Sequence, residues 1–96
     1  MRQKVLELLL QIPKGRVTTY RELAKAARTG PRAVGAIMRS NRQPGFYPCY
    51  KVISSTGHVG EYSGPGGVQE KIRMLRADGV EVKNGRVDLE RFLHRF

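Results

Sequence analysis

The sequence predicts one small domain that is mainly α-helical with short β segments, of the winged-helix-like kind that contains a helix-turn-helix. Two observations carry the prediction. Apolar residues recur at helical spacing in four segments, and glycine-rich turns separate short extended segments in the second half. The 96 residues, with 40% hydrophobic residues and 11 glycines, leave room for a single domain over residues 1–96 with one modest core.

The first half of the chain predicts three helices. Apolar residues within positions 5–10 cover one broad helical face, and Pro13 ends that helix. Thr19 and Glu22 match a capping box, in which Thr19 accepts the amide of Glu22 and the carboxylate of Glu22 reaches back. A stop at Thr29-Gly30 follows, and Pro31 suits the first position of a third helix with arginines on its outer face.

Two short helices joined by a tight turn, the second of them basic, are typical of a helix-turn-helix. An ordinary helical hairpin is the alternative. The net charge of +10, from 18 Lys and Arg against 8 Asp and Glu, favours the nucleic-acid-binding version. The same charge also fits a ribosome-associated or simply basic protein, because charge alone predicts only salt-sensitive phosphate binding.

The second half predicts extended segments, tight turns and one more helix. Residues 46–53 form an apolar-rich extended segment, because Pro48 disfavours helix for the residue before it. The same reasoning predicts a turn at 54–57, a short extended segment at 59–62, a helix through 68–75 that closes at 78–79, and a tight turn at 84–85.

Cys49 is the first candidate for chemistry. A lone cysteine is usually a small buried hydrophobe, but here Pro48 fixes the backbone before it and the chain is cationic. Positive surroundings favour the thiolate and an apolar pocket disfavours it, so both readings stay open at this stage. A single cysteine forms no internal disulfide and suits a reducing compartment, so we expect a cytoplasmic protein.

Several other classes of site are not expected. His58 in a turn and His94 near the end are predicted to be solvated surface residues rather than activating bases. Without a second thiol we expect no metal site, and no cofactor is indicated. The glycine-rich loop at 64–67 lacks the ending of a phosphate-binding loop. No apolar run approaches the ~20 residues of a membrane span, and no signal peptide is expected.

Ordered motifs then cover nearly the whole chain. They are Ile12-Pro-Lys-Gly-Arg-Val-Thr-Thr-Tyr20 with Leu23-Ala24, Pro31-Arg-Ala-Val-Gly-Ala36, Asn41 with Pro48-Cys49 and Val52-Ile53, Gly57 with Val59-Gly60 and Tyr62-Ser-Gly64, and Lys71 and Leu75 with 79–82 and 85–89. Together they resemble the C-terminal DNA-binding and active-site domain of the O6-alkylguanine-DNA alkyltransferases. They are also similar to the related alkyltransferase-like proteins.

The resemblance implies an activity. These proteins bind duplex DNA through a helix-turn-helix, rotate an alkylated guanine out of the stack and transfer its alkyl group irreversibly to a cysteine. By resemblance, the catalytic residues are Cys49, Tyr50 and Asp78; the substrate-binding residues are Tyr62, Ser63, Gly64, Val52 and Asn41; and the DNA-binding residues are Tyr20, Arg32, Ala33, Gly35 and Arg39. Arg32 is implied to fill the place of the rotated base, and the partner is double-stranded DNA containing O6-alkylguanine.

Three positions depart from the family pattern. Tyr50 stands where the family has a histidine that takes the thiol proton, and Tyr, with an unperturbed pKa near ~10, is a poor base at neutral pH. Lys51 replaces an arginine, and Asp78 stands where a glutamate is expected. Without the histidine, we expect Asp78 to pair with a cation such as Lys71 or to cap the helix.

The familiar alkyltransferases have an N-terminal domain before this one; we expect none here, and this expectation points toward the alkyltransferase-like proteins. Those bind alkylated guanine without transfer, hand the lesion to excision-repair proteins, and usually carry Trp or Ala in place of the cysteine. Because Cys49 is present, we favour transfer by a monomer and keep the lesion-binding alternative. A regulator with a structural cysteine is the third reading.

Overall fold

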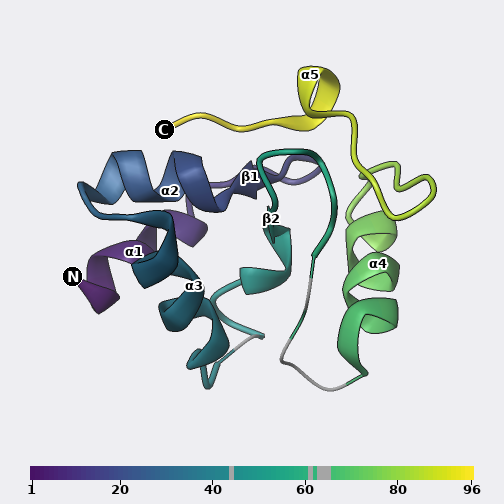
Figure 1. Cartoon of the computed structure of the whole chain (residues 1–96). Helices are drawn as coiled ribbons and strands as arrows, with labels where there is room; N and C mark the ends of the chain where they lie inside the picture. Colours follow the sequence, from purple (N-terminus) through teal and green to yellow (C-terminus); the bar gives the residue numbers. More distant parts are fainter. Residues whose placement is uncertain (44, 61, 63–65) are drawn as a thin grey trace.

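The computed structural model describes residues 1–43, 45–60, 62 and 66–96. The elements are α1 (Arg2–Leu9), β1 (Thr18–Thr19), α2 (Tyr20–Ala27), α3 (Pro31–Arg39), the 3-10 turn η1 (Cys49–Lys51), β2 (Val52–Ile53), α4 (Gly67–Ala77) and α5 (Leu89–Phe92). Helices α1, α2 and α3 lie on one side of the two short strands and α4 lies on the other (Figure 1). The predicted mainly helical fold with short β segments is confirmed.

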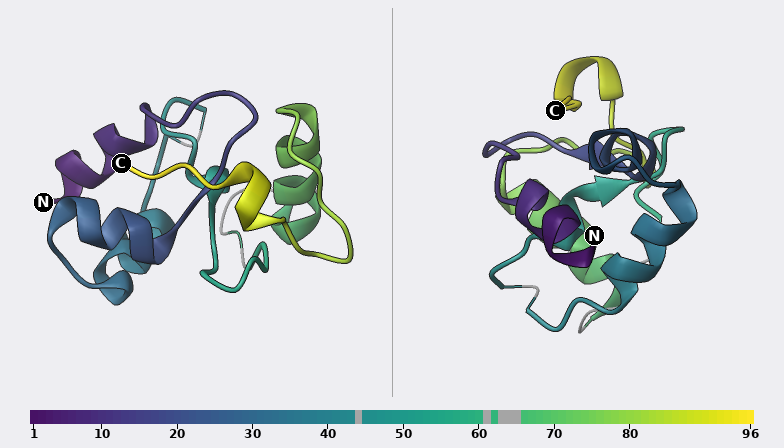
Figure 2. Two further views of the ribbon diagram at one scale, coloured as in Figure 1. Left: turned by 90° about the horizontal axis from the view of Figure 1, so that it is seen from above. Right: turned by 90° about the vertical axis from the view of Figure 1, so that its left-hand side faces the viewer.

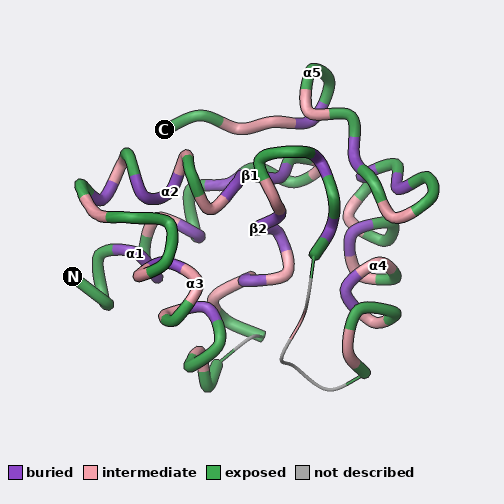
Figure 3. Tube along the Cα trace, viewed as in Figure 1, coloured by how far each residue is buried: buried purple, intermediate pink, exposed green. Residues whose placement is uncertain are grey.

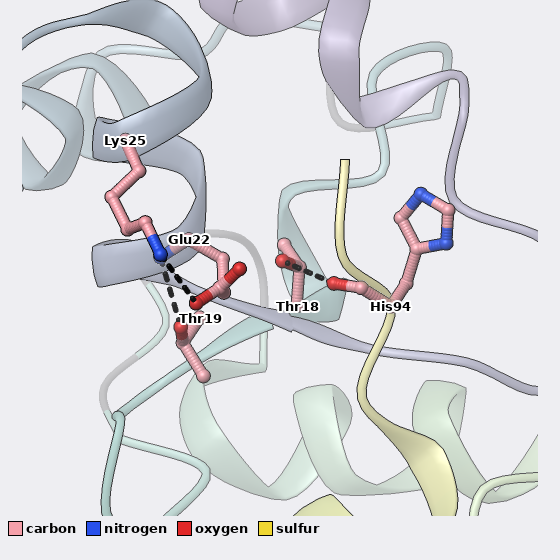
Figure 4. A network of polar contacts seen from close by, with 5 residues as sticks. All are labelled: Thr18, Thr19, Glu22, Lys25 and His94. Carbon is pink, nitrogen blue, oxygen red and sulfur yellow. Dashed lines mark hydrogen bonds and ion pairs between the residues drawn. The ribbon is translucent and has the colours of Figure 1, made fainter.

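The helices of the first half begin and end on local signals. The amide of Glu22 donates to Thr19 Oγ1 at 3.1 Å, so the Thr19 half of the capping box is present (Figure 4). Pro31 lies in the first turn of α3. The end of α2 differs from the prediction, because Arg28 already adopts a left-handed conformation, with φ of 58°. This conformation lets the Thr29 amide reach the Ala24 carbonyl at 2.8 Å and close the helix before Gly30.

A first core cluster fills the space between α1, α2 and α3 and reaches the segment that carries Cys49. Small residues of α2, including Ala24 and Ala27, let α3 pack closely against it. Buried members of this cluster are Val5, Leu6, Leu9, Ile12, Leu23, Ala24, Ala27, Val34, Met38, Cys49 and Val52. Figure 3 shows buried stretches along each of these three helices.

A second core cluster joins α4 to the C-terminal part of the chain. Its buried members are Val17, Ile53, Val59, Leu75, Val80, Val82, Val87 and Phe92. Strands β1 and β2 pair in parallel between the two clusters, with Thr18 opposite Val52 and Thr19 opposite Ile53. The segment 49–53 therefore contributes residues to both clusters.

The segment around Cys49 differs from the predicted extended conformation. Residues 49–51 form one 3-10 turn, in which the Lys51 amide donates to the Pro48 carbonyl at 3.1 Å, and only Val52–Ile53 is a strand. The fixed φ of Pro48 is compatible with the start of a turn. Pro48 restricts the backbone conformation of Tyr47 before it, but it does not force the residues after it into an extended conformation.

The C-terminal part returns across the molecule above β1 (Figures 1 and 2). The His94 amide donates to the Val17 carbonyl at 2.6 Å, and Thr18 Oγ1 donates to the His94 carbonyl at 3.1 Å (Figure 4). His94 is half-buried by these contacts rather than solvated as predicted.

The turns of the second half follow the predicted glycines. Asn84 and Gly85 both have positive φ, which makes the tight turn between Lys83 and Arg86. Helix α4 closes with a bond from the Val80 amide to the Leu75 carbonyl at 2.9 Å. Helix α5 was not predicted. Within the described residues, no helix is both long enough and apolar enough to cross a membrane.

Candidate active site

Cys49 lines a pocket of about 240 Å³ between α2, α3, η1 and α4. The volume lies below the roughly 300–1,000 Å³ of pockets for drug-sized ligands, which suits one compact flat group. The lining residues among the described part of the chain are Tyr20, Gly35, Met38, Arg39, Cys49, Tyr62 and Lys71. The site therefore combines residues that are far apart in the sequence.

Two larger hollows lie near the C-terminal part of the chain, with volumes of about 490 and 430 Å³. Their linings hold charged residues of α2, of the turn at 83–86 and of α5, such as Lys25, Arg86 and Glu90, but no cysteine. Size alone does not identify a reactive site, and the smaller pocket is the one that contains a nucleophile.

The loop before Cys49 is held by Asn41. Asn41 Nδ2 donates to the Tyr47 carbonyl at 3.0 Å, and Asn41 Oδ1 accepts the Gln43 amide at 2.9 Å. The Cys49 amide donates to the same Tyr47 carbonyl at 2.7 Å. Asn41 thus fixes the approach to the cysteine and is not among the residues that line the pocket.

Lys71 enters the pocket from α4 and is almost fully buried, with 1% exposure. Its Nζ donates to the Val52 carbonyl at 2.9 Å. Burial lowers the pKa of Lys71 to about 8, and the charge of Cys49 acts in the opposite direction. Lys71 lies four positions before the inward Leu75, so helical spacing places both residues on the same buried face of α4.

Tyr62 lines the same pocket and is half-buried. Burial raises the pKa of its phenol, and the charges of Cys49 and Glu70 raise it further. The hydroxyl therefore keeps its proton at neutral pH and can donate a hydrogen bond. Of the predicted substrate residues, Ser63 and Gly64 lie outside the described residues, and Val52 presents its carbonyl to Lys71.

Tyr50 is not among the described residues that line the pocket, and it packs against the second core cluster, as Ile72 and Leu89 do. Burial raises the pKa of its phenol, and the charges of Asp78 and Tyr62 add to this effect. Tyr50 therefore remains protonated at neutral pH and is not able to take a proton from the thiol.

Asp78 forms a buried ion pair with Lys51. Lys51 Nζ lies 2.8 Å from Asp78 Oδ2 and also donates to the Pro13 carbonyl at 3.0 Å. The Gly15 amide donates to the same carboxylate oxygen at 2.8 Å. The carboxylate thus ties the end of α4 to η1 and to the turn after α1.

Asp78 pairs with a cation as predicted, but the cation is Lys51 rather than Lys71. Asp78 and Lys71 are seven positions apart on one helix, which separates them by roughly 10 Å along its axis. Lys51 approaches the end of α4 from η1 instead, and its side chain is only 5% exposed. The alternative prediction, that Asp78 caps the helix, agrees with its position as the C-cap residue of α4.

Residues of α3 form one wall of the pocket and the exposed surface beside it. Gly35 and Arg39 line the pocket, and Tyr20 joins them from the start of α2. Arg32 is exposed and Ala33 is half-buried on the same helix. A Cβ added at Gly35 would lie 3.5 Å from the Arg39 guanidinium, which is an ordinary van der Waals contact.

The two histidines lie away from Cys49. His58 is exposed and contacts Thr56 and Arg86, and His94 is held by Val17 and Thr18. In the ranges that the structure describes, no three His, Cys, Asp or Glu side chains come together to hold a metal ion.

Residues 1–80 match the family model described as "6-O-methylguanine DNA methyltransferase, DNA binding domain". The chain is 51% identical over 87 residues to a bifunctional methyltransferase/endonuclease of Picrophilus torridus, covering 88% of this chain and 28% of the relative. It is 42% identical over 80 residues to a methylated-DNA–protein-cysteine methyltransferase of Thermococcus kodakarensis, covering 82% of this chain and 44% of the relative. The chain thus spans less than half the length of these curated relatives.

A solved structure is similar over almost the full length of both proteins. It is S. pombe Atl1 in complex with damaged DNA containing O6-carboxymethylguanine, with a TM-score of 0.88 and 25% identity. The match covers 99% of this chain and 94% of Atl1. With the family model covering 80 of the 96 residues, these findings identify the chain as a member of the 6-O-methylguanine DNA methyltransferase family, in the part that forms its DNA-binding domain.

Proposed function

We propose that this protein repairs DNA by rotating an O6-alkylated guanine into the Cys49 pocket and transferring the alkyl group irreversibly to the Cys49 sulfur. Its substrate is double-stranded DNA that contains O6-alkylguanine, and it acts as a monomer. The observation that carries the proposal is the position of the chain's sole cysteine in a compact pocket beside the basic helix α3.

Groups in and beside the pocket support this reaction. A thiolate attacks the alkyl carbon, the bond between that carbon and O6 breaks, and the protein keeps a thioether. Tyr62 carries a protonated hydroxyl that can donate to the guanine as negative charge develops on it. Val52 presents a carbonyl, which has a second lone pair for the exocyclic amine of the base.

DNA binding is assigned to the exposed side of α3. An extruded base loses its stacking and pairing, which costs a few kcal/mol that contacts to the DNA offset. In this proposal Arg32 occupies the space that the base leaves, Tyr20 presses on the adjacent phosphate, and Ala33 and Gly35 let α3 approach the groove. The net charge of +10 supplies sequence-independent attraction to phosphates.

A second candidate function is binding of the lesion without transfer, with delivery to excision-repair proteins. The similarity to Atl1 over nearly the full length of both proteins favours it, because that structure is a complex with damaged DNA. The presence of Cys49 favours transfer.

The test is to incubate the protein with a duplex that contains one O6-methylguanine and to measure both binding and intact mass. We expect preferential binding to the lesion and a gain of one methyl group, which Cys49→Ser abolishes. Lesion-preferring binding with no mass change establishes the second candidate. Equal affinity for damaged and undamaged duplex together with no mass gain contradicts both candidates.

A further inference from the structure

We infer that the segment 91–94 positions Tyr20 in the pocket by holding strand β1, so that residues near the end of the chain control recognition of the lesion. The inference rests on the proposed function for its DNA-binding readout. Its structural step, the hold of the segment on Tyr20, is a property of the free protein and is testable without DNA.

The backbone of the segment 91–94 is bonded to the residue that leads into β1. The Val17 amide donates to the Phe92 carbonyl at 2.9 Å, and the His94 amide donates to the Val17 carbonyl at 2.6 Å. Val17 and Leu93 are thereby paired in parallel. Strand β1 begins at the next residue, Thr18, and pairs with β2.

Side chains reinforce this pairing on both sides of Val17. Thr18 Oγ1 donates to the His94 carbonyl at 3.1 Å (Figure 4), and the Arg16 guanidinium donates to the Arg91 carbonyl at 2.7 Å. Val17 and Thr18 are fully buried. The segment 91–94 therefore holds three successive residues, 16 to 18, by their backbone or side chains.

The sheet needs this support because its strands are short. Strands β1 and β2 have two residues each. An isolated two-stranded ribbon is at best marginally stable in water, and a third strand stabilises it. The segment 91–94 supplies the equivalent of a third strand through its bonds to Val17. It lies beyond residues 1–80, which match the family model.

Strand β1 runs directly into the pocket wall. Thr19, its last residue, caps α2 by accepting the Glu22 amide at 3.1 Å. Tyr20 is the first residue of α2 and lines the pocket with Cys49. Since Cys49 lies in η1, directly before β2, the pairing of β1 with β2 sets how Tyr20 faces Cys49 across the pocket.

The segment 91–94 acts through β1 and not by contact with the base. None of its residues is among the described residues that line the pocket. Thr18 and His94 are therefore positioning residues, and their effect on the lesion passes through Tyr20.

The first measurement follows the ring signals of Tyr20 by NMR in the free protein. His94→Pro removes the amide that donates to Val17, and Leu93 already has the extended conformation that a proline requires before it. The matched control, His94→Ala, loses the same imidazole but keeps the amide. We expect the Tyr20 signals to move in His94→Pro and to stay in His94→Ala. Signals that stay in both variants, or that move no more than those of Tyr47 in the loop before Cys49, overturn the inference.

A second pair of variants measures lesion recognition without changing the backbone. Thr18→Val removes the hydroxyl that donates to His94 and keeps the branched shape, whereas Thr18→Ser keeps the hydroxyl. We expect Thr18→Val to lower the preference for an O6-methylguanine duplex over undamaged duplex about fivefold, the scale of one lost hydrogen bond. Thr18→Ser should keep the wild-type preference.

Fluorescence anisotropy measures both affinities at one salt concentration. Binding to undamaged duplex should stay unchanged in Thr18→Val, because this binding depends on charge and the charge is the same. Equal weakening of binding to both duplexes would mean a general loss of structure and would overturn the inference. The same loss of preference in Thr18→Ser would also overturn it, because the hydroxyl would then have no part in the effect.

A double-mutant cycle tests the route through Tyr20. Tyr20→Phe keeps the ring and removes the hydroxyl that reaches the phosphate in the proposed function. In this background Thr18→Val should change the preference by less than about twofold, because coupled residues are not additive. A full additive effect contradicts the route. A wild type without lesion preference, whose Tyr20 signals still move in His94→Pro, refutes the proposed function but leaves the hold of the segment 91–94 on Tyr20 standing.

Discussion

Cys49 and Tyr50 are neighbours in the sequence, but their side chains pack in different core clusters. Cys49 packs with the first core cluster and faces the pocket, whereas Tyr50 packs with the second cluster behind it. The cause is the 3-10 turn at 49–51, which rotates successive side chains by about 120°. A residue directly after the cysteine is therefore close in sequence without lining the pocket.

Two buried lysines repeat this contrast. Lys51 lies behind the pocket, and the carboxylate of Asp78 neutralises it at 2.8 Å. Lys71 lies in the pocket, bonded to a carbonyl, and its pKa is lowered to about 8. The structure thus contains one buried lysine in an ion pair with a carboxylate and a second buried lysine that donates to a backbone carbonyl in the pocket. The predictions below test each side of this contrast.

The largest effect is expected behind the pocket. Asp78→Ala leaves the Lys51 ammonium buried without its carboxylate, which costs about 3–5 kcal/mol in the free energy of unfolding. Urea unfolding followed by circular dichroism measures the loss. The control is Glu81→Ala, which breaks the exposed pair with Arg91 and costs at most about 1 kcal/mol. Equal losses in the two variants would mean that the buried pair has no special role.

The second effect is a dependence of stability on pH at Lys71. Below its folded pKa of about 8, Lys71 is charged in both states and burial of the charge destabilises the fold. Above that pH the folded protein loses the proton while the unfolded chain keeps it, so stability rises with pH. Between pH 8 and 10 we expect the free energy of unfolding of the wild type to rise by roughly 2–3 kcal/mol relative to Lys71→Met.

Denaturant unfolding at several pH values measures this difference. Tyr50 and Tyr62, whose pKa values are raised, keep their protons in the folded state and are common to both proteins. A difference between wild type and Lys71→Met that stays constant with pH would refute the lowered pKa.

The third effect concerns the exposed side of α3. Arg32→Ala is expected to lower the preference for an O6-methylguanine duplex over undamaged duplex about tenfold, since each lost specific contact costs about 1–3 kcal/mol. The salt dependence of binding to undamaged DNA should stay nearly the same. Fluorescence anisotropy at several salt concentrations measures both, and Arg95→Ala in the exposed tail is the control. Equal weakening of binding to the O6-methylguanine duplex and to undamaged duplex would indicate that Arg32 contacts a phosphate.

The smallest effect is a gain in stability at the pocket wall. Gly35 lies inside α3, where glycine costs about 0.5–1 kcal/mol relative to alanine. An added Cβ meets the Arg39 guanidinium at an ordinary 3.5 Å, so Gly35→Ala should raise the free energy of unfolding by that amount. The same methyl group narrows the pocket and should weaken lesion binding. A variant with higher stability and unchanged lesion binding would show that Gly35 does not contact the bound lesion.

The helices could be predicted because their signals are local. Thr19 caps α2, Pro31 begins α3, and Asn84 with Gly85 makes the tight turn, each through its own backbone or its near neighbours. The burial of Leu75 likewise follows from helical spacing. The motifs around Cys49 led to the family, which the match over residues 1–80 confirms.

The charge pairing could not be predicted, because it depends on segments that are distant in the sequence. Asp78 meets Lys51 and Gly15 only after α4, η1 and the turn after α1 have packed together. The lowered pKa of Lys71 depends in the same way on burial by several elements. A proline restricts the conformation of the residue before it, here Tyr47, and not that of the residues after it. The prediction that residues 49–51 are extended is therefore wrong, because they form a 3-10 turn.

The most direct test of transfer to Cys49 uses a duplex whose O6-methyl group carries deuterium. After single-turnover reaction, peptide mapping by mass spectrometry locates the label. The account predicts one labelled methyl group per protein on the peptide that contains Cys49, and no labelled peptide in Cys49→Ser. A protein that binds the lesion tightly while Cys49 stays unlabelled would contradict it.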